Sequence, residues 1–261
     1  MSRAVSSRGR SSAAAAAGTL LRGLQDYFWQ SERPLTALIF LLPMIVLYEV
    51  GTHFFASDWS RHTETRVLAF NLLRQFMEIF GATGRYLPGL VVVGVLLTWH
   101  AARRDPWQLH VGTAMGMLVE SAMLALPLLV LGNLVGHFLP LYAASNAWKG
   151  GIVLALGAGI YEELVFRLMA FTLLNILFID LLRIRKRAAY VLIVLVSSAL
   201  FSAYHYWSPQ SGPFRWSDCV FRTASGIYFG ALFITRGFGV TAGSHISYDI
   251  YYFLLHAFRL P

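Results

Sequence analysis

Long apolar runs separated by short polar segments dominate the chain. They lie near residues 35–55, 86–100, 113–138, 151–180, 189–206, 220–235 and 238–258. A membrane-spanning helix needs about 20 mostly apolar residues, and most of these runs approach or exceed that length. The pattern therefore predicts an all-α fold, a polytopic transmembrane helix bundle of about seven to eight spans.

Two segments outside these runs carry their own pattern. In 63–80 the apolar residues recur at helical spacing among polar ones, which predicts a helix that lies in the membrane interface or packs on the bundle; both alternatives stay open. Residues 1–18 are rich in Ser, Ala and Arg without an acidic residue, which is typical of disorder. We expect a disordered cytoplasmic tail over 1–34 and a single transmembrane bundle over 35–261.

Composition and charge support a membrane location. Hydrophobic residues make up 57% of the chain and charged residues only 13%, against about 25% charged in soluble domains. The net charge of +8 would suit a nucleic-acid partner, but the basic residues cluster between apolar runs. Their distribution fits the positive-inside rule with a cytoplasmic N-terminus. We therefore expect the chain to lie in a lipid bilayer, and we expect no nucleic-acid partner.

The compartment and the redox chemistry follow from two further features. We expect an integral protein of a bacterial inner membrane, while an organellar membrane stays open because the first 18 residues resemble a transit peptide. The single cysteine, Cys219, excludes an internal disulfide and a Cys-rich metal site.

Three charges interrupt the apolar run 151–179, namely Glu162, Glu163 and Arg167. Each charge near the bilayer centre costs roughly 2.5–3.5 kcal/mol on insertion scales. Glu163 and Arg167 lie four apart on one helical face and can form a structural ion pair. Glu162 projects about 100° away from Glu163 and is presented to another partner.

Later spans offer such partners. His205 ends one apolar run, and His245 and Asp249 share a face of the last one. Polar groups at membrane depth usually face the bundle interior, so these side chains could converge with Glu162 on one site. The alternative is that each is a polar group satisfied by local packing.

Three short motifs resemble those of one family. EELVFR (162–167), FSAYH (201–205) and HISYD (245–249) agree in order and spacing with the motifs of the CPBP or Abi family, which includes the type II CAAX prenyl endopeptidases. The resemblance covers about 151–258, where we place the catalytic core. It implies an intramembrane endopeptidase that cuts near the C-terminus of a membrane-associated protein or peptide.

The resemblance also assigns roles to residues. Glu162 would activate water, His205 would help to hold that water, and His245 with Asp249 would stabilise the oxyanion. Glu163, Arg167 and Phe201 would support them. Family members with Asn at the last position can donate to the oxyanion, whereas an ionised Asp249 only accepts. We expect Asp249 to orient His245 instead; a protonated Asp249 is the alternative.

Other chemistries compete with this interpretation. Glu162, His205 and His245 would also make a catalytic zinc set, although the His-Glu-x-x-His signature is missing; we favour chemistry without a cofactor and leave zinc open. Two further functions stay open, a non-catalytic binding or self-immunity protein of the same family and a proton-coupled transporter.

Overall fold

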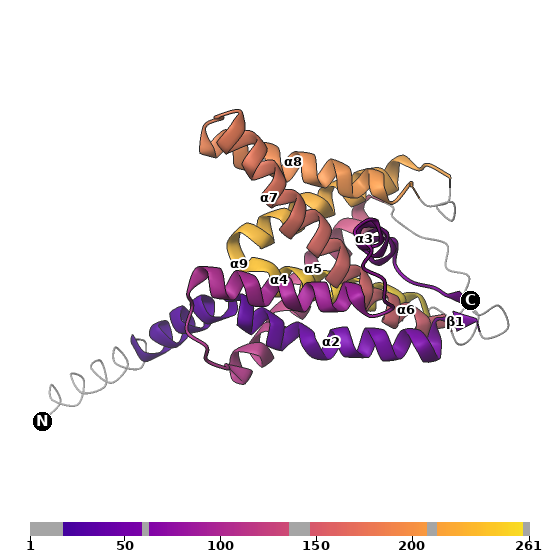
Figure 1. Cartoon of the computed structure of the whole chain (residues 1–261), viewed down its shortest axis with the longest axis horizontal. Helices are drawn as coiled ribbons and strands as arrows, with labels where there is room; N and C mark the ends of the chain where they lie inside the picture. Colours follow the sequence, from indigo (N-terminus) through magenta and orange to yellow (C-terminus); the bar gives the residue numbers. More distant parts are fainter. Residues whose placement is uncertain (1–17, 59–62, 136–146, 208–212, 258–261) are drawn as a thin grey trace, which may run out of the picture.

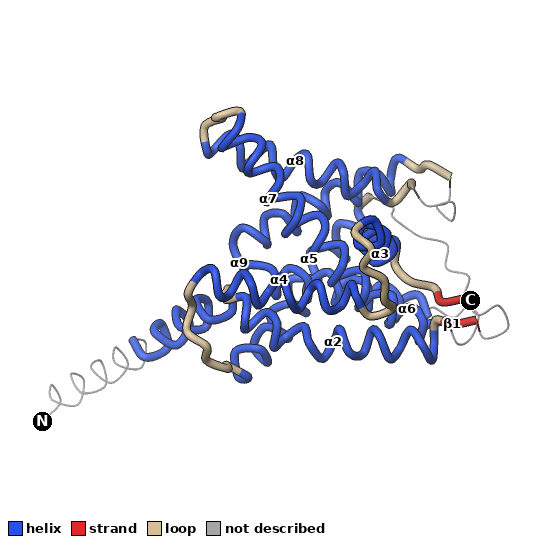
Figure 2. Tube along the Cα trace, in the orientation of Figure 1, coloured by secondary structure: helices blue, strands red, loops and turns tan. Residues whose placement is uncertain are grey.

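The fold is almost entirely helical (Figures 1 and 2). A computed structural model describes residues 18–58, 63–135, 147–207 and 213–257. Two short strands, β1 (Ser57–Asp58) and β2 (Thr63–Glu64), pair antiparallel beside the end of the first long helix. The all-helical class predicted from the apolar runs is confirmed.

The helices follow the apolar runs closely. They are α2 (Pro34–Phe55), α3 (Leu68–Ile79), α4 (Leu87–Arg103), α5 (Val111–Leu134), α6 (Ala147–Gly157), η1 (Ala158–Glu162), η2 (Leu164–Met169), α7 (Ala170–Asn175), η3 (Ile176–Leu181), α8 (Lys186–Tyr204) and α9 (Trp216–Ala257). The three η segments are π-helical turns, and the stretch from α6 to η3 is one unbroken helix. It crosses the bundle obliquely in Figure 1.

Four of the described helices are long and apolar enough to cross a membrane. They are Pro34–Phe55, Val111–Leu134, Trp148–Leu181 and Lys186–Tyr204, and the shorter Leu87–Arg103 is also apolar. Their length and composition support the predicted membrane location.

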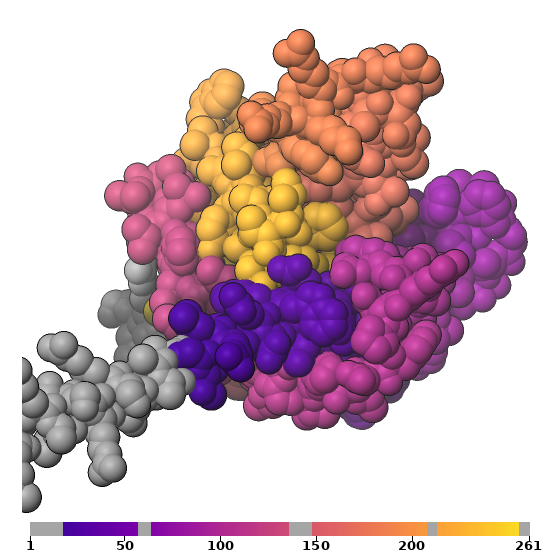
Figure 3. Space-filling model, turned by 90° about the vertical axis from the view of Figure 1, so that its left-hand side faces the viewer, coloured from indigo at the N-terminus to yellow at the C-terminus, as the bar shows by residue number. Residues whose placement is uncertain are grey.

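A sharp bend divides α9 into two arms. Gly237 has φ 74° and ψ −177°, a backbone conformation that only glycine adopts readily. A Cβ at this position would also lie 3.5 Å from the Glu32 Cα. The bend separates the runs predicted at 220–235 and 238–258. In Figure 3 the C-terminal part of the chain, in yellow, lies between the N-terminal part, in indigo, and the segment drawn in orange.

Residues 18–31 form a helix, although the sequence predicted a disordered tail there. Its Tyr27 hydroxyl donates to Glu120 Oε2 at 2.6 Å, and Arg236 donates to both oxygens of the same carboxylate at 2.6 and 2.8 Å. This three-residue network ties the helix to α5 and to the bend of α9. Such long-range contacts are invisible in the local composition. Residues 1–17 lie outside the described part of the chain.

The helix α3 occupies the segment that was predicted to be interfacial or packed on the bundle. Phe70 and Leu73 are buried against the bundle, whereas Phe76 and Ile79 are exposed. Its approach is fixed by Arg66, which donates to Glu49 Oε2 at 2.8 Å. One face of α3 therefore packs on the bundle, and its exposed apolar residues remain available to the interface.

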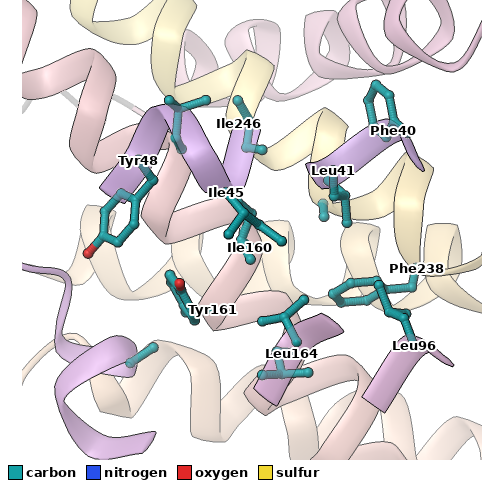
Figure 4. Close-up of a cluster of buried hydrophobic side chains, with 14 of the residues drawn as sticks. Phe40, Leu41, Ile45, Tyr48, Leu96, Ile160, Tyr161, Leu164, Phe238 and Ile246 are labelled. Carbon is teal, nitrogen blue, oxygen red and sulfur yellow. The ribbon is translucent and has the colours of Figure 1, made fainter. Parts of the chain in front are cut away.

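The main hydrophobic core surrounds the π-helical turn η1 (Figure 4). Ile160 and Tyr161 of η1 pack with Ile45 and Tyr48 of α2, which come from far earlier in the chain. On the opposite side η1 approaches the second arm of α9 so closely that a Cβ on Gly159 would lie 2.8 Å from the Ala242 carbonyl oxygen. The turn that ends in Glu162 is therefore fixed from both sides.

Candidate active site

Glu162 faces two histidines from two other helices. It is the last residue of η1 and is buried. Its Oε2 atom lies 3.8 Å from His205 Nε2 and 3.8 Å from His245 Nε2. The structure thus brings together three side chains that are separated by 43 and 40 positions in the sequence. π-Helical turns are frequent at functional sites, and two of them flank Glu163 here.

His205 follows the last residue of α8, and its ring is fixed by the helix itself. Its Nδ1 atom donates to the Phe201 carbonyl at 2.8 Å, because a carbonyl oxygen can only accept. The Phe201 ring meets the imidazole edge to face with the centroids 4.8 Å apart. The four-residue spacing of FSAYH therefore directs Nε2 toward Glu162.

His245 lies on the second arm of α9 and is held on both of its sides. Its Nδ1 atom is 2.7 Å from Glu163 Oε1. Its ring stacks on Phe229 of the first arm, with centroids 4.7 Å apart and planes at 16°. These contacts leave Nε2 directed toward Glu162.

Asp249 lies on the same side of the His245 ring as Glu162. Its Oδ2 atom is 3.6 Å from His245 Nε2, which is beyond hydrogen-bonding distance. The sequence predicted Asp249 as the residue that orients His245, but Glu163 makes the hydrogen bond to the ring in this structure. The four-residue spacing placed Asp249 near the ring correctly; it could not reveal the contact from another helix.

Arg167 neutralises Glu163 in the interior, as their spacing predicts. Its Nε atom is 3.1 Å from Glu163 Oε2, although the two are not aligned as a hydrogen bond. Its Nη2 donates to the Gly226 carbonyl at 3.2 Å. The guanidinium also lies over the rings of Phe201 and Phe229, 4.5 and 5.5 Å from their centroids. The same rings therefore contact both the cation and a histidine.

Two neighbours of the site were missed in the sequence. Tyr204 donates its hydroxyl to Glu162 Oε1 at 3.3 Å, and Phe229 stacks on His245. Tyr204 stands inside the motif FSAYH, directly before His205, so its position was a usable signal. Phe229 is one of 19 phenylalanines and carries no such signal.

The other intramembrane glutamates belong to separate networks. Glu49 pairs with Arg66, and Glu120 pairs with Arg236. A cavity of about 620 Å³ opens between α4, α7, α8 and the bend of α9, but none of the four candidate catalytic residues lines it. The candidate site is therefore confined to the cluster around Glu162.

The cluster does not close on one metal ion in the observed arrangement. Ligand atoms about 2.0–2.2 Å from a tetrahedral zinc lie about 3.4 Å from each other, and Glu162 Oε2 is 3.8 Å from each imidazole nitrogen. Among the described residues no group of three or more His, Cys, Asp or Glu side chains is suited to hold a metal.

Comparison with known proteins identifies the region that carries the site. Residues 144–251 match a family model described as type II CAAX prenyl endopeptidase Rce1-like. The matched region is thus similar to that family over 144–251. The Rce1-like region contains all three motifs, and together with the four candidate spans it indicates an integral membrane protease. No curated protein and no solved structure matches the chain.

Proposed function

We propose that this protein is an intramembrane endopeptidase that cleaves a peptide bond near the C-terminus of a membrane-associated protein or peptide. The observation that carries the proposal is the buried Glu162 carboxylate facing two imidazole nitrogens at 3.8 Å each. A carboxylate with imidazoles at this distance can share one water molecule with them.

In the proposed reaction, Glu162 Oε2 accepts a proton from the attacking water, and His205 Nε2 accepts a second hydrogen bond from the same water. The water oxygen bonds to the scissile carbonyl carbon and forms a tetrahedral intermediate. Glu162 then returns the proton to the leaving nitrogen, and the C–N bond breaks to give a carboxylic acid, which keeps the second proton of the water, and an amine.

His245 stabilises the negative oxygen of this intermediate. With a proton on both ring nitrogens, Nδ1–H donates to Glu163 and Nε2–H can donate to the oxyanion. Asp249 Oδ2 lies 3.6 Å from the same Nε2, beyond hydrogen-bonding distance. Glu163 therefore orients the ring, and Arg167 in turn balances the charge of Glu163.

We assign this chemistry to the protein's own side chains, with no cofactor. This choice is supported by the distance of 3.8 Å from Glu162 Oε2 to each imidazole nitrogen, which is longer than the distance between two ligands of one zinc ion. Treatment with a strong zinc chelator should leave the initial rate of the purified protein unchanged. A loss of activity that added zinc restores would contradict the proposal.

We also propose how the chain sits in the membrane. The kinked α9 and the short α4 would add to the four long helices to make about seven spans, with the N-terminus in the cytoplasm. This orientation is supported by a basic cluster in the turn after η3 and at the start of α8, namely Arg183, Arg185, Lys186 and Arg187. Residues 35–261 would form one bundle in a bacterial inner membrane, with the catalytic core at about 151–258.

The test is Glu162→Gln in protein reconstituted into vesicles. The probe is a quenched fluorescent peptide that ends in a prenylated cysteine and three further residues, with an unprenylated peptide beside it. We expect the variant to be folded and inactive. Glu78→Gln, an exposed glutamate on α3, is the matched control and should retain activity.

A second measurement covers substrates unlike the probe. Membrane proteins from cells with and without the active protein are compared for the mass of their C-termini. If no C-terminus changes, or if Glu162→Gln changes the same C-termini as the wild type, the peptidase proposal is wrong and a non-catalytic binding role takes its place.

A further inference from the structure

The two oxygens of the Glu162 carboxylate have different surroundings. Oε1 accepts a hydrogen bond from Tyr204 at 3.3 Å, whereas Oε2 is the atom that faces His205 and His245. Oε2 has no hydrogen-bond partner among the described residues, and both oxygens belong to a buried side chain. Oε1 is therefore held by Tyr204, while Oε2 is directed toward the two histidines.

Tyr204 itself is held firmly. It is the last residue of α8 and is buried. Its ring packs against Phe166 of η2, with centroids 5.1 Å apart. The ring of Tyr204 is therefore held by η2, and its hydroxyl is directed to Glu162 of η1.

A fixed hydroxyl matters because the last torsion of a glutamate is soft. The carboxylate of Glu rotates in a broad, roughly two-fold well, unlike the staggered torsions nearer the backbone. Rotation about this bond moves Oε2 out of the plane in which it can reach both imidazoles. A hydrogen bond to Oε1 restricts that rotation without occupying Oε2.

We propose that Tyr204 is a positioning residue, which fixes the plane of the Glu162 carboxylate so that Oε2 alone acts as the base. The inference rests on the proposed peptidase function. It assigns a role to a tyrosine, in addition to the roles proposed for the glutamates, the histidines and Asp249.

The experiment compares Tyr204→Phe with Tyr206→Phe. Phenylalanine keeps the ring contact with Phe166 and removes only the hydroxyl. Tyr206 also donates a hydrogen bond, at 3.3 Å to the Arg215 carbonyl, but it does not contact Glu162 in the described structure. Both variants are reconstituted and assayed with the prenylated fluorescent peptide for kcat and KM, and their melting temperatures are measured in detergent.

Loss of a hydrogen bond that stabilises a charged group in the rate-limiting step lowers the rate about tenfold to a hundredfold. We expect Tyr204→Phe to lower kcat by that factor, with KM and melting temperature close to those of Tyr206→Phe. Equal kcat in the two variants would overturn the inference. So would a loss of kcat that comes with an equal loss of stability.

The two proposals fail in different ways. If the wild type cleaves the peptide, Glu162→Gln is inactive and Tyr204→Phe is as fast as Tyr206→Phe, only the positioning role is wrong. If Glu162→Gln cleaves the peptide as fast as the wild type, the peptidase mechanism is wrong and the positioning role falls with it.

Discussion

Arg167 is the residue whose replacement should most clearly separate stability from chemistry. Its side chain is fully buried, and it offers its charge to Glu163 at 3.1 Å and one hydrogen bond to Gly226 at 3.2 Å. Methionine has a similar length and can pack against the Phe201 and Phe229 rings. Arg167→Met therefore removes the charge while it largely preserves the volume.

The expected loss follows from the carboxylate left behind. Removing one partner of a buried ion pair typically destabilises a protein by about 3–5 kcal/mol, because the other charge remains in a dry environment. His245 still contacts Glu163, so we expect the lower part of this range, about 3 kcal/mol. The measurement is the free energy of unfolding in mixed detergent micelles, followed by circular dichroism.

The double variant Glu163→Gln with Arg167→Met provides the control. It removes both charges, and replacement of a whole buried ion pair is often neutral for stability. We expect the double variant to recover most of the lost stability but to remain poorly active, because glutamine holds the His245 ring without its charge. If Arg167→Met alone unfolds like the wild type, or if the double variant is the less stable of the two, the assignment of the pair as structural is refuted.

Two further substitutions test the packing and the chemistry. Gly159→Ala should destabilise the protein by about 1–3 kcal/mol, since its Cβ would meet the Ala242 carbonyl oxygen at 2.8 Å; Gly112→Ala, where a Cβ meets nothing within 4 Å, is the matched control for the same unfolding measurement. Asp249→Asn should retain peptidase activity, because Asp249 does not hydrogen-bond to His245 and an amide could donate to the oxyanion; a complete loss of cleavage would show that its charge is essential.

The apolar runs predicted the all-helical class and most of the described helices, because lipid allows few polar residues within a spanning helix. Glu162, His205 and His245 stood out as polar residues in these runs, and the structure brings them together. The Glu163–Arg167 pair followed from helical spacing alone.

The contacts between helices could not be obtained in this way. The hydrogen bond from His245 to Glu163 and the one from Tyr204 to Glu162 span 82 and 42 positions, so no periodic pattern encodes them. The helix of residues 18–31 was missed for a similar reason, since it depends on Glu120 and Arg236 in distant helices. The π-helical turns η1 and η2 also change the angle between successive side chains, so the regular step of about 100° per residue does not hold there.

The polar side chains of the site differ in how far they are exposed. Arg167 and Glu163 have no exposed side-chain surface, His245 and Glu162 have 6% and 8%, and His205 has 25%. The fully buried residues are the Glu163–Arg167 ion pair, whose opposite charges compensate each other without water. Glu163 orients the His245 ring by a hydrogen bond, and His205 is oriented by the Phe201 carbonyl of its own helix. Asp249, whose Oδ2 atom lies 3.6 Å from His245 Nε2, has an exposed fraction of 22%. The proposed base Glu162 therefore has a more exposed neighbour in His205, whereas the ion pair that holds His245 is fully buried. This arrangement lets Glu163 and Arg167 fix the His245 ring without competition from solvent.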